Sequence, residues 1–352
     1  ATLTLGADIS GSVAHPAETV KYSFTLAAPT TLLVDTGNAS NTNSLTWSLT
    51  GPRGSEASLR AFNASSNSLL SLPAGTYEFS VAFGDLTTGT YNFRLVDAAT
   101  TPVLAPDVAT QLTLDPASHA QAYQLVVPEA GDFVFNPASY TNYGSGWRVA
   151  DRLGNTLRSG NMGAATQPFS LAAGRYYFVV DGPDNMVGTG QYEFMLHRIV
   201  TTAQTLALNT GVGGSIDSVG QRYDYSFSIN TPTSVLFDSL SNRGDLVWEL
   251  TGPTGTLRSN ISFNGSDGGA WNAPIRLDAA GNYHLRVLPQ GAASGAFSFR
   301  LLDLAAAAPL PLDNQQLLTL NPGSSARLFS LDANAGDYWK LDVAGVGGGS
   351  AL

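Results

Sequence analysis

The 352-residue sequence has no cysteine, few charged residues and no long apolar run, and each shortage excludes a class of protein. Without cysteine, neither disulfides nor thiolate metal sites can hold the fold together, so each domain must bury its own core. Charged residues make up only 12% of the chain, and the net charge is −10. Nucleic acid is therefore not expected as a partner, because binding phosphates requires a basic surface. No stretch approaches the roughly 20 apolar residues of a membrane-spanning helix.

Glycine, serine, threonine, asparagine and alanine take the place of the missing charges. The 37 glycines and the small polar residues are typical of turns and of polar β surfaces, while a hydrophobic share of 43% suffices for a core. This composition favours an extracellular β protein. The chain starts at Ala1 without a signal peptide, so we expect any export signal to lie outside this sequence.

Alternating apolar and polar residues predict β-strands along most of the chain. In the segment 20–26, for example, every second residue is apolar, which is the pattern of a half-buried strand. Helical periodicity is almost absent. The side chains that we expect between two antiparallel sheets are Tyr22, Phe24, Trp47, Tyr77, Phe79, Tyr91 and Phe93. Those that we expect in solvent are Lys21, Glu78, Asn92 and Arg94.

A pair of strand patterns recurs about every hundred residues. The turn Ala-Gly-x-Tyr begins at residues 74, 173 and 280, and each copy is followed by Gly-x-(Tyr/Phe)-x-Phe-x-Leu. Trp47, Trp147 and Trp248 occupy matching positions before it. A period of this length indicates tandem domains rather than one large fold. Short strands at this density are typical of β-sandwiches.

The repeats alternate between two types. Leu5 to Tyr22 and Leu208 to Tyr225 both span 17 positions, whereas Leu114 to Tyr123 and Leu320 to Phe329 span only 9. We therefore predict an all-β chain of antiparallel β-sandwich (jelly-roll or immunoglobulin-like) modules in the order A-B-A-B. The predicted modules are A1 (1–106), B1 (107–201), A2 (202–312) and an incomplete B2 (313–352).

The incomplete B2 raises a separate expectation. Residues 313–352 match only about the first four strands of a B module, which would leave an open sheet edge and an uncovered apolar face. We expect the native polypeptide to continue and cover them. The alternative is that a neighbouring molecule donates the missing strands.

The order of these motifs resembles a known bacterial family. Tyr-x-Phe, Trp-x-Leu-x-x-Pro-x-Gly, Ala-Gly-x-Tyr and Gly-x-Tyr-x-Phe-x-Leu together resemble the pre-peptidase C-terminal β-sandwich, and in particular its tandem copies in very large secreted and surface proteins. The resemblance spans nearly the whole chain, although B1 lacks the Pro-x-Gly turn after its tryptophan. It implies a non-catalytic extracellular module; family members are linked to peptidases, to substrate attachment and sometimes to Ca²⁺.

The sequence offers little support for catalysis. His15, His119, His197 and His284 do not recur at equivalent positions, and neither a zinc-protease motif nor a nucleophile elbow is present. A fold built by repetition would be expected to repeat its active site. We therefore predict that the chain is not an enzyme.

Two further features have a functional and a structural interpretation. The three repeated tryptophans could stack on sugar rings, but their strand context favours core positions, and Trp271 is the better candidate for an exposed ring. Arg243-Gly244-Asp245 spells an integrin-recognition tripeptide, yet Gly-Asp before a strand is also ordinary turn chemistry.

Calcium is the ligand that the sequence favours most. Hard cations bind clustered carboxylate and amide oxygens on loops, although such Asx-Gly clusters also form ordinary turns. The residues that we predict as ligands are Asp181, Asp184, Asn185, Asp238 and Asp245.

The function predicted from sequence is a structural or adhesive segment of a large exported bacterial surface protein, acting as a stalk, spacer or scaffold. The expected partners are neighbouring repeats or other copies of the chain, and surface polysaccharide or matrix protein. The alternative is a carbohydrate- or protein-binding accessory region of a secreted hydrolase or peptidase.

Overall fold

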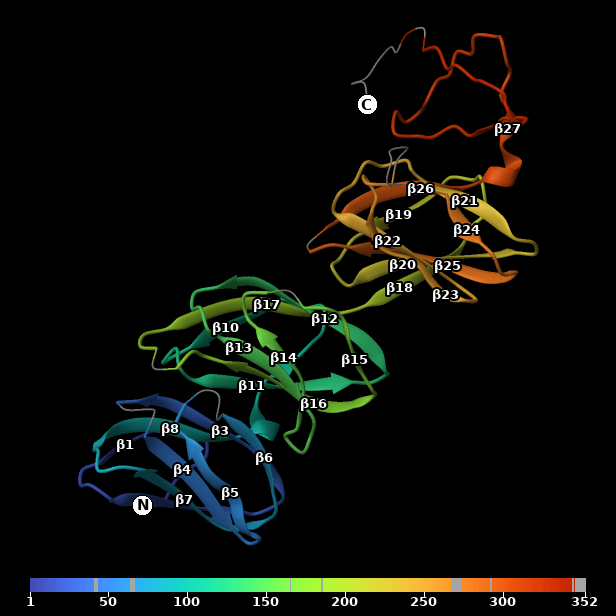
Figure 1. Cartoon of the computed structure of the whole chain (residues 1–352). Helices are drawn as coiled ribbons and strands as arrows, with labels where there is room; N and C mark the ends of the chain where they lie inside the picture. Colours follow the sequence, from blue (N-terminus) through green and yellow to red (C-terminus); the bar gives the residue numbers. More distant parts are fainter. Residues whose placement is uncertain are drawn as a thin grey trace. The chain divides into compact units, whose positions relative to one another are not determined.

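A computed structural model describes residues 1–40, 44–63, 67–164, 166–184, 186–266, 274–291, 293–343 and 345. By contacts the chain forms two compact units, Ala1–Ile199 and Val200–Leu352. Nearly all regular structure is β, which confirms the predicted all-β class (Figure 1). Among the described residues, no helix is long and apolar enough to span a membrane.

Module A1 is a sandwich of two four-stranded antiparallel sheets. In spatial order, one sheet contains β1 (Ile9–Val13), β8 (Gly89–Asp97), β3 (Thr30–Ala39) and β6 (Ser68–Leu72). The other contains β2 (Thr19–Leu26), β7 (Gly75–Phe83), β4 (Leu45–Gly51) and β5 (Gly54–Ala61). The short 3₁₀ helix η2 (Ala98–Thr100) follows β8.

Module B1 repeats this topology with one additional strand. Its first sheet contains β10 (Thr110–Leu114), β17 (Gly190–Arg198), β12 (Gly131–Tyr140) and β15 (Phe169–Leu171). Its second contains β14 (Thr156–Asn161), β13 (Gly146–Ala150), β16 (Gly174–Asp181), β11 (Ala120–Val127) and β9 (Val103–Leu104).

Module A2, in the second unit, has the same two layers. One sheet contains β18 (Val200–Thr205), β20 (Gln221–Ile229), β25 (Gly281–Pro289), β22 (Leu246–Gly252) and β23 (Gly255–Ser262). The other contains β19 (Val212–Ile216), β26 (Gly295–Asp303), β21 (Thr233–Ser239) and β24 (Ile275–Leu277). The 3₁₀ helix η3 (Leu304–Ala306) follows β26.

The connecting segment before a module pairs with that module's own sheet. β9 is parallel to β11, and β18 is parallel to β20 over six residue pairs. Strand pairing thus places Val103 and Leu104, which the predicted boundaries assign to A1, in the sheet of B1. It places Val200 and Thr201, which the predicted boundaries assign to B1, in the sheet of A2.

The predicted core of A1 is confirmed. All seven aromatic side chains expected between the sheets are buried, the most exposed being Tyr22 at 8%. Trp47, Trp147 and Trp248 are each at most 1% exposed, so they are core residues and not sugar-stacking platforms. Trp271 lies outside the described residues.

The predicted strands of B2 are largely missing from the part that the structure describes. Between residues 313 and 343 there is only β28 (Phe329–Ser330), which is parallel to β27 (Ala308–Pro309). The apolar residues Leu318, Phe329 and Tyr338 are exposed. In B1 the matching strands pair with β16 and β17, and the sequence after residue 313 holds no counterpart of either strand. Without a partner ladder these segments do not form strands.

Candidate functional site

The outer face of the β3 and β8 sheet in A1 is covered rather than solvated. Strand β3 is buried continuously from Leu32 to Gly37, on both faces. Leu33 and Leu69 on this outer face pack against small apolar residues of B1. The cluster between the two modules consists of Leu33, Leu69, Ala98, Ala120, Ala122, Ala150 and Val179.

An aspartate and an arginine at this face bind the backbone of one alanine in B1. Arg94 Nε donates to Asp35 Oδ2 over 2.6 Å. Asp35 Oδ1 accepts the N–H of Ala120 at 3.0 Å, and Arg94 Nη2 donates to the Ala120 carbonyl at 2.5 Å. The pair thereby satisfies both backbone groups of Ala120 at the start of β11. We call this arrangement the Asp–Arg clamp.

The second unit contains the same clamp. Arg300 Nε donates to Asp238 Oδ2 over 2.5 Å. Asp238 Oδ1 accepts the N–H of Ala326 at 2.9 Å, and Arg300 Nη2 donates to the Ala326 carbonyl at 2.6 Å. Both aspartates are fully buried. Burial raises the pKa of Asp238, and the hydrogen bonds from Arg300 and Ala326 oppose this shift.

The prediction that Arg94 faces solvent is therefore wrong. The side chain does point to the outer face, as the alternation requires, but B1 covers that face and the side chain is only 20% exposed. Lys21 meets the expectation, since it is exposed and pairs with Glu78 at 2.8 Å. Glu78 and Asn92 are intermediate in exposure.

Additional polar contacts surround the clamp in the first unit. His119, which is buried, lies with Nδ1 3.0 Å from Asp35 Oδ2 and with Nε2 3.6 Å from Asp8 Oδ1. Asn67 of A1 binds Asp181 of B1, and Thr31 Oγ1 donates to a B1 carbonyl at 3.1 Å. These contacts join the two sandwich faces to each other.

The predicted calcium ligands are dispersed. Asp181 pairs with Arg148, Asp238 with Arg300, and Asp245 with Arg243. Asn185 lies outside the described residues, and Asp184 is exposed. Within the part of the chain that the structure describes, no three histidine, aspartate or glutamate side chains gather as a metal site would require. Calcium binding at these residues remains a prediction.

The pKa values of two of these carboxyls shift in opposite directions. Burial raises the pKa of Asp181 to about 6, against the opposing effects of Arg148 and Asn67. At Asp245, hydrogen bonds from Arg243 lower the pKa.

In the Arg-Gly-Asp tripeptide, the arginine and aspartate side chains bind each other. Arg243 donates to Asp245 through Nε at 2.8 Å and through Nη2 at 2.6 Å. Arg243 also donates to the carbonyls of Ser294 and Ala296. The arginine thus fastens the loop before β22, as the turn interpretation expects.

The histidines occupy unrelated settings. His197 contacts Asp107 at 3.2 Å, and His284 contacts Asp224 at 2.9 Å on the outer face of A2. His119 belongs to the A1–B1 contact, and His15 is exposed. No histidine arrangement recurs between the modules.

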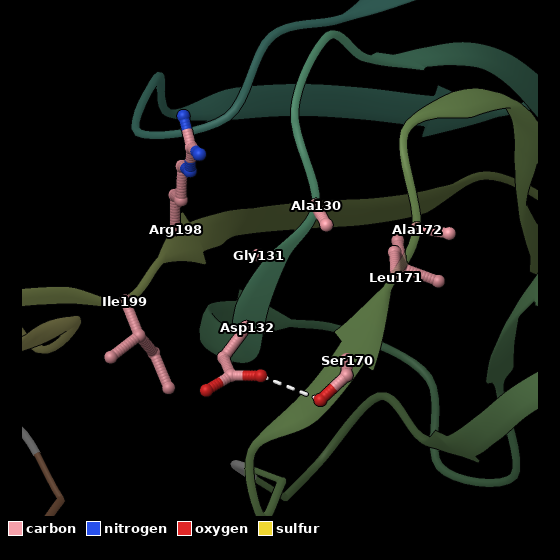
Figure 2. A pocket seen from close by; sticks show the side chains of 8 residues that line it. All are labelled: Ala130, Gly131, Asp132, Ser170, Leu171, Ala172, Arg198 and Ile199. Atoms are coloured by element: carbon pink, nitrogen blue, oxygen red, sulfur yellow. Dashed lines mark hydrogen bonds between the residues drawn. The ribbon is translucent and has the colours of Figure 1, made fainter.

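An open pocket of about 500 Å³ in B1 also lacks a convergent group of polar side chains. Figure 2 shows that Ser170 donates to Asp132, at 2.6 Å, while the Arg198 side chain points away from both. The remaining lining is Ala130, Gly131, Leu171, Ala172 and Ile199.

Sequence reasoning missed the clamp, although two signals pointed to it. Leu32-Leu33-Val34 and Val235-Leu236-Phe237 break the alternation, and such continuous apolar runs indicate strands buried on both faces. An aspartate follows the first run directly, and an aspartate also follows the second. Buried aspartates require a partner, which the arginines of β8 and β26 supply.

Comparison with known proteins finds weakly similar solved structures, among them β-sandwich domains. No protein-family model and no curated protein matches the sequence. The pre-peptidase C-terminal domain of a collagenase from Bacillus anthracis matches at 20% identity, over 27% of this chain and 93% of that one, with a TM-score of 0.25. The CUB1-EGF-CUB2 domain of human MASP-1/3 matches at 8% identity, over 55% of this chain and 100% of that one, with a TM-score of 0.18.

A triple jelly-roll protein of an archaeal virus turret matches at 10% identity, over 82% of each chain, with a TM-score of 0.18. Likenesses this weak carry no argument about activity. The sheets described above, rather than these likenesses, show that the chain is a tandem β-sandwich protein.

Proposed function

We propose that this chain is a non-catalytic structural segment of a large exported bacterial protein, in which tandem sandwiches act as a stalk, spacer or surface scaffold. The observation that supports it is the recurrence of one structural contact. The Asp–Arg clamp appears at 35, 94 and 120 and again at 238, 300 and 326, with Arg and Ala 26 positions apart in both copies.

Three of the predicted ligand side chains are occupied in ion pairs. Asp181, Asp238 and Asp245 each pair with an arginine, and the repeated tryptophans fill cores. A module whose repeated features are all structural is best suited to holding other parts at a distance. The low charge density and the polar, glycine-rich surface favour an extracellular location.

Surface exposure on the native cell tests this proposal. Intact cells of the source organism are treated with a protease, and the chain is followed with an antibody raised against residues 1–352. We expect its loss without lysis, together with survival of a cytoplasmic control protein. Protection of the chain until the cells are broken would contradict the proposal.

The mass and composition of the native polypeptide separate the stalk from the alternative. Immunoprecipitation and peptide mapping should find further sandwich repeats in the same polypeptide. A peptidase or glycosidase domain attached to these residues would instead favour the accessory-module function.

A further inference from the structure

The outer face with which B1 contacts A1 differs in its residues from the equivalent outer face of the A modules. On the B1 side the face of the β11, β13 and β16 sheet carries small apolar residues beside one ion pair, Arg148 with Asp181. The apolar residues are Ala120, Ala122, Ala150, Tyr177 and Val179. The small apolar residues let another sheet approach closely, and the charged residues of this face are already paired with each other.

The A modules carry polar residues at the same positions. The ladders align on Gly75, Gly174 and Gly281, which pair with the last residues of β2, β11 and β20 respectively. In A1 the matching residues are Thr19, Lys21, Thr50, Glu78 and Ser80. In A2 they are Arg222, Asp224, Thr251, His284 and Arg286. Burying these charged side chains against an apolar sheet would cost free energy, so we do not expect the A face to dock as the B face does.

On the outer face of the other sheet, the A modules carry the Asp–Arg pair and B1 does not. Asp35 pairs in register with Arg94 in A1, and Asp238 with Arg300 in A2. The same register positions of B1 hold Asn136 and Met195. Asparagine and methionine cannot form the charged fork, so B1 has no clamp with which to hold a following module in this way.

We propose that the outer face of β3 and β8 in A1, and of β21 and β26 in A2, is a docking face that selects a B-type module as its C-terminal neighbour. The clamp fixes the backbone of the alanine that begins the B module's first long strand, and the apolar B face closes over Leu33 or its counterpart Leu236. The A–B pair is therefore the assembly unit of the array, and its order cannot be reversed. This inference concerns module order and goes beyond the proposed function, because it would hold in an array of any role.

Distances between spin labels in the full chain test this docking. Because the chain has no cysteine, Leu59→Cys in A1 and Leu157→Cys in B1 create the two labelling sites. Both leucines are exposed, at 73% and 51%. In the otherwise unchanged chain we expect one narrow distance distribution, measured by double electron–electron resonance.

Two double variants should broaden that distribution. Asp35→Asn with Arg94→Met installs the B-type pair on the A face, and Ala122→Lys with Val179→Ser installs A1 residues on the B face. For either we expect about twofold or greater broadening, the behaviour of domains without a specific interface. Lys21→Ala with Glu78→Ala is the matched control, since it removes an exposed ion pair from A1 outside the docking face, and it should leave the width unchanged.

Tryptophan emission, to which the buried Trp47, Trp147 and Trp248 contribute, checks that the cores remain folded in each variant. A narrow distribution in both double variants with intact cores would overturn the proposal, as would a broad distribution in the unsubstituted chain. If the first double variant fails to fold, Arg94→Lys decides, because lysine keeps the charge but cannot reach Asp35 and the Ala120 carbonyl with one planar fork. A width identical to that of the unsubstituted chain would then overturn the proposal, and partial broadening would support it.

Discussion

Asn67 of A1 donates a hydrogen bond from Nδ2 to Asp181 Oδ1 of B1 over 3.2 Å. The carboxyl group of Asp181 also faces Arg148 of its own module. The side chain of Asp181 is only 13% exposed and lies in the contact between the two sandwiches. Separating the sandwiches would therefore change the surroundings that set its pKa.

The stability of the first unit should depend on pH through Asp181. Its folded pKa of about 6 lies above the ordinary value of 3.8, so between these values the folded state binds the proton more tightly than the unfolded state. The contribution of this group to the free energy of unfolding therefore grows as pH falls from 6 to 4, by about 2–3 kcal/mol. It is lost as pH rises through 6.

Asp181→Asn isolates this contribution. Urea unfolding of the wild-type chain and of the variant at several pH values gives the difference between their unfolding free energies. The contributions of the other carboxyl groups cancel in this difference. We expect the unfolding free energy of the wild-type chain to increase relative to that of the variant as pH falls from 6 to 4. A difference that is flat over this range, or that grows with rising pH, would show that Arg148 rather than burial sets the pKa.

Gly154→Ala should weaken the A1–B1 contact. Gly154 has φ +89°, and a Cβ there would lie 2.1 Å from the Leu69 carbonyl oxygen of A1. Backbone strain and the clash add up, and we expect a loss of about 2–4 kcal/mol in thermal or urea unfolding.

Gly54 provides the matched control. It has φ +90° in the hairpin between β4 and β5, and nothing lies within 4 Å of its added Cβ. Gly54→Ala should cost only the backbone strain, about 1–2 kcal/mol. Equal losses at the two glycines would mean that the Leu69 contact contributes nothing.

Ser266→Ala should destabilise A2 through its tryptophan. The buried Trp248 Nε1 donates to Ser266 Oγ over 2.7 Å, and the substitution removes the only acceptor recorded for it among the described residues. We expect a loss of about 1–3 kcal/mol. Adding Trp248→Phe removes the donor as well, so the double variant should lose less than the sum of the two single losses; strict additivity would argue against this bond.

Calcium should act only at millimolar concentration. An ion at Asp181, Asp238 or Asp245 must compete with Arg148, Arg300 and Arg243, and weak extracellular sites bind at about 10⁻⁴–10⁻³ M. We expect a Tm that rises between chelator and millimolar calcium and does not respond to magnesium. An identical Tm in chelator and in 10⁻² M calcium would remove the metal prediction.

The sequence predicts the interior of each sandwich better than its exterior. The two-residue period places Tyr22, Phe24 and Trp47 on one side of their strands, and the structure has no other way to bury them. Outer-face residues such as Arg94 are different, because their surroundings depend on the neighbouring module. The same period that correctly directs Arg94 outward cannot say whether water or B1 lies there.

The candidate site shows the same limit. The calcium prediction groups Asp181 and Asp238 with loop oxygens that are close to them in the sequence. Their actual partners, Asn67 and Arg300, lie 114 and 62 positions away. Only the strand registers reveal these contacts. A comparison of matching ladder positions, Asp35–Arg94 with Asn136–Met195, would have separated the A and B faces had the registers been known.

The parallel pairing of β18 with β20 has a mechanical consequence. Six consecutive residue pairs join the connecting segment 200–205 to the sheet of A2, whereas only two join β9 to β11. Tension along a strand loads the hydrogen bonds of such a ladder side by side, so they must break together rather than peel one after another. Under a pulling force, the segment before A2 should therefore detach from its sheet at a higher force than the segment before B1. The shorter ladder, between β9 and β11, should break first.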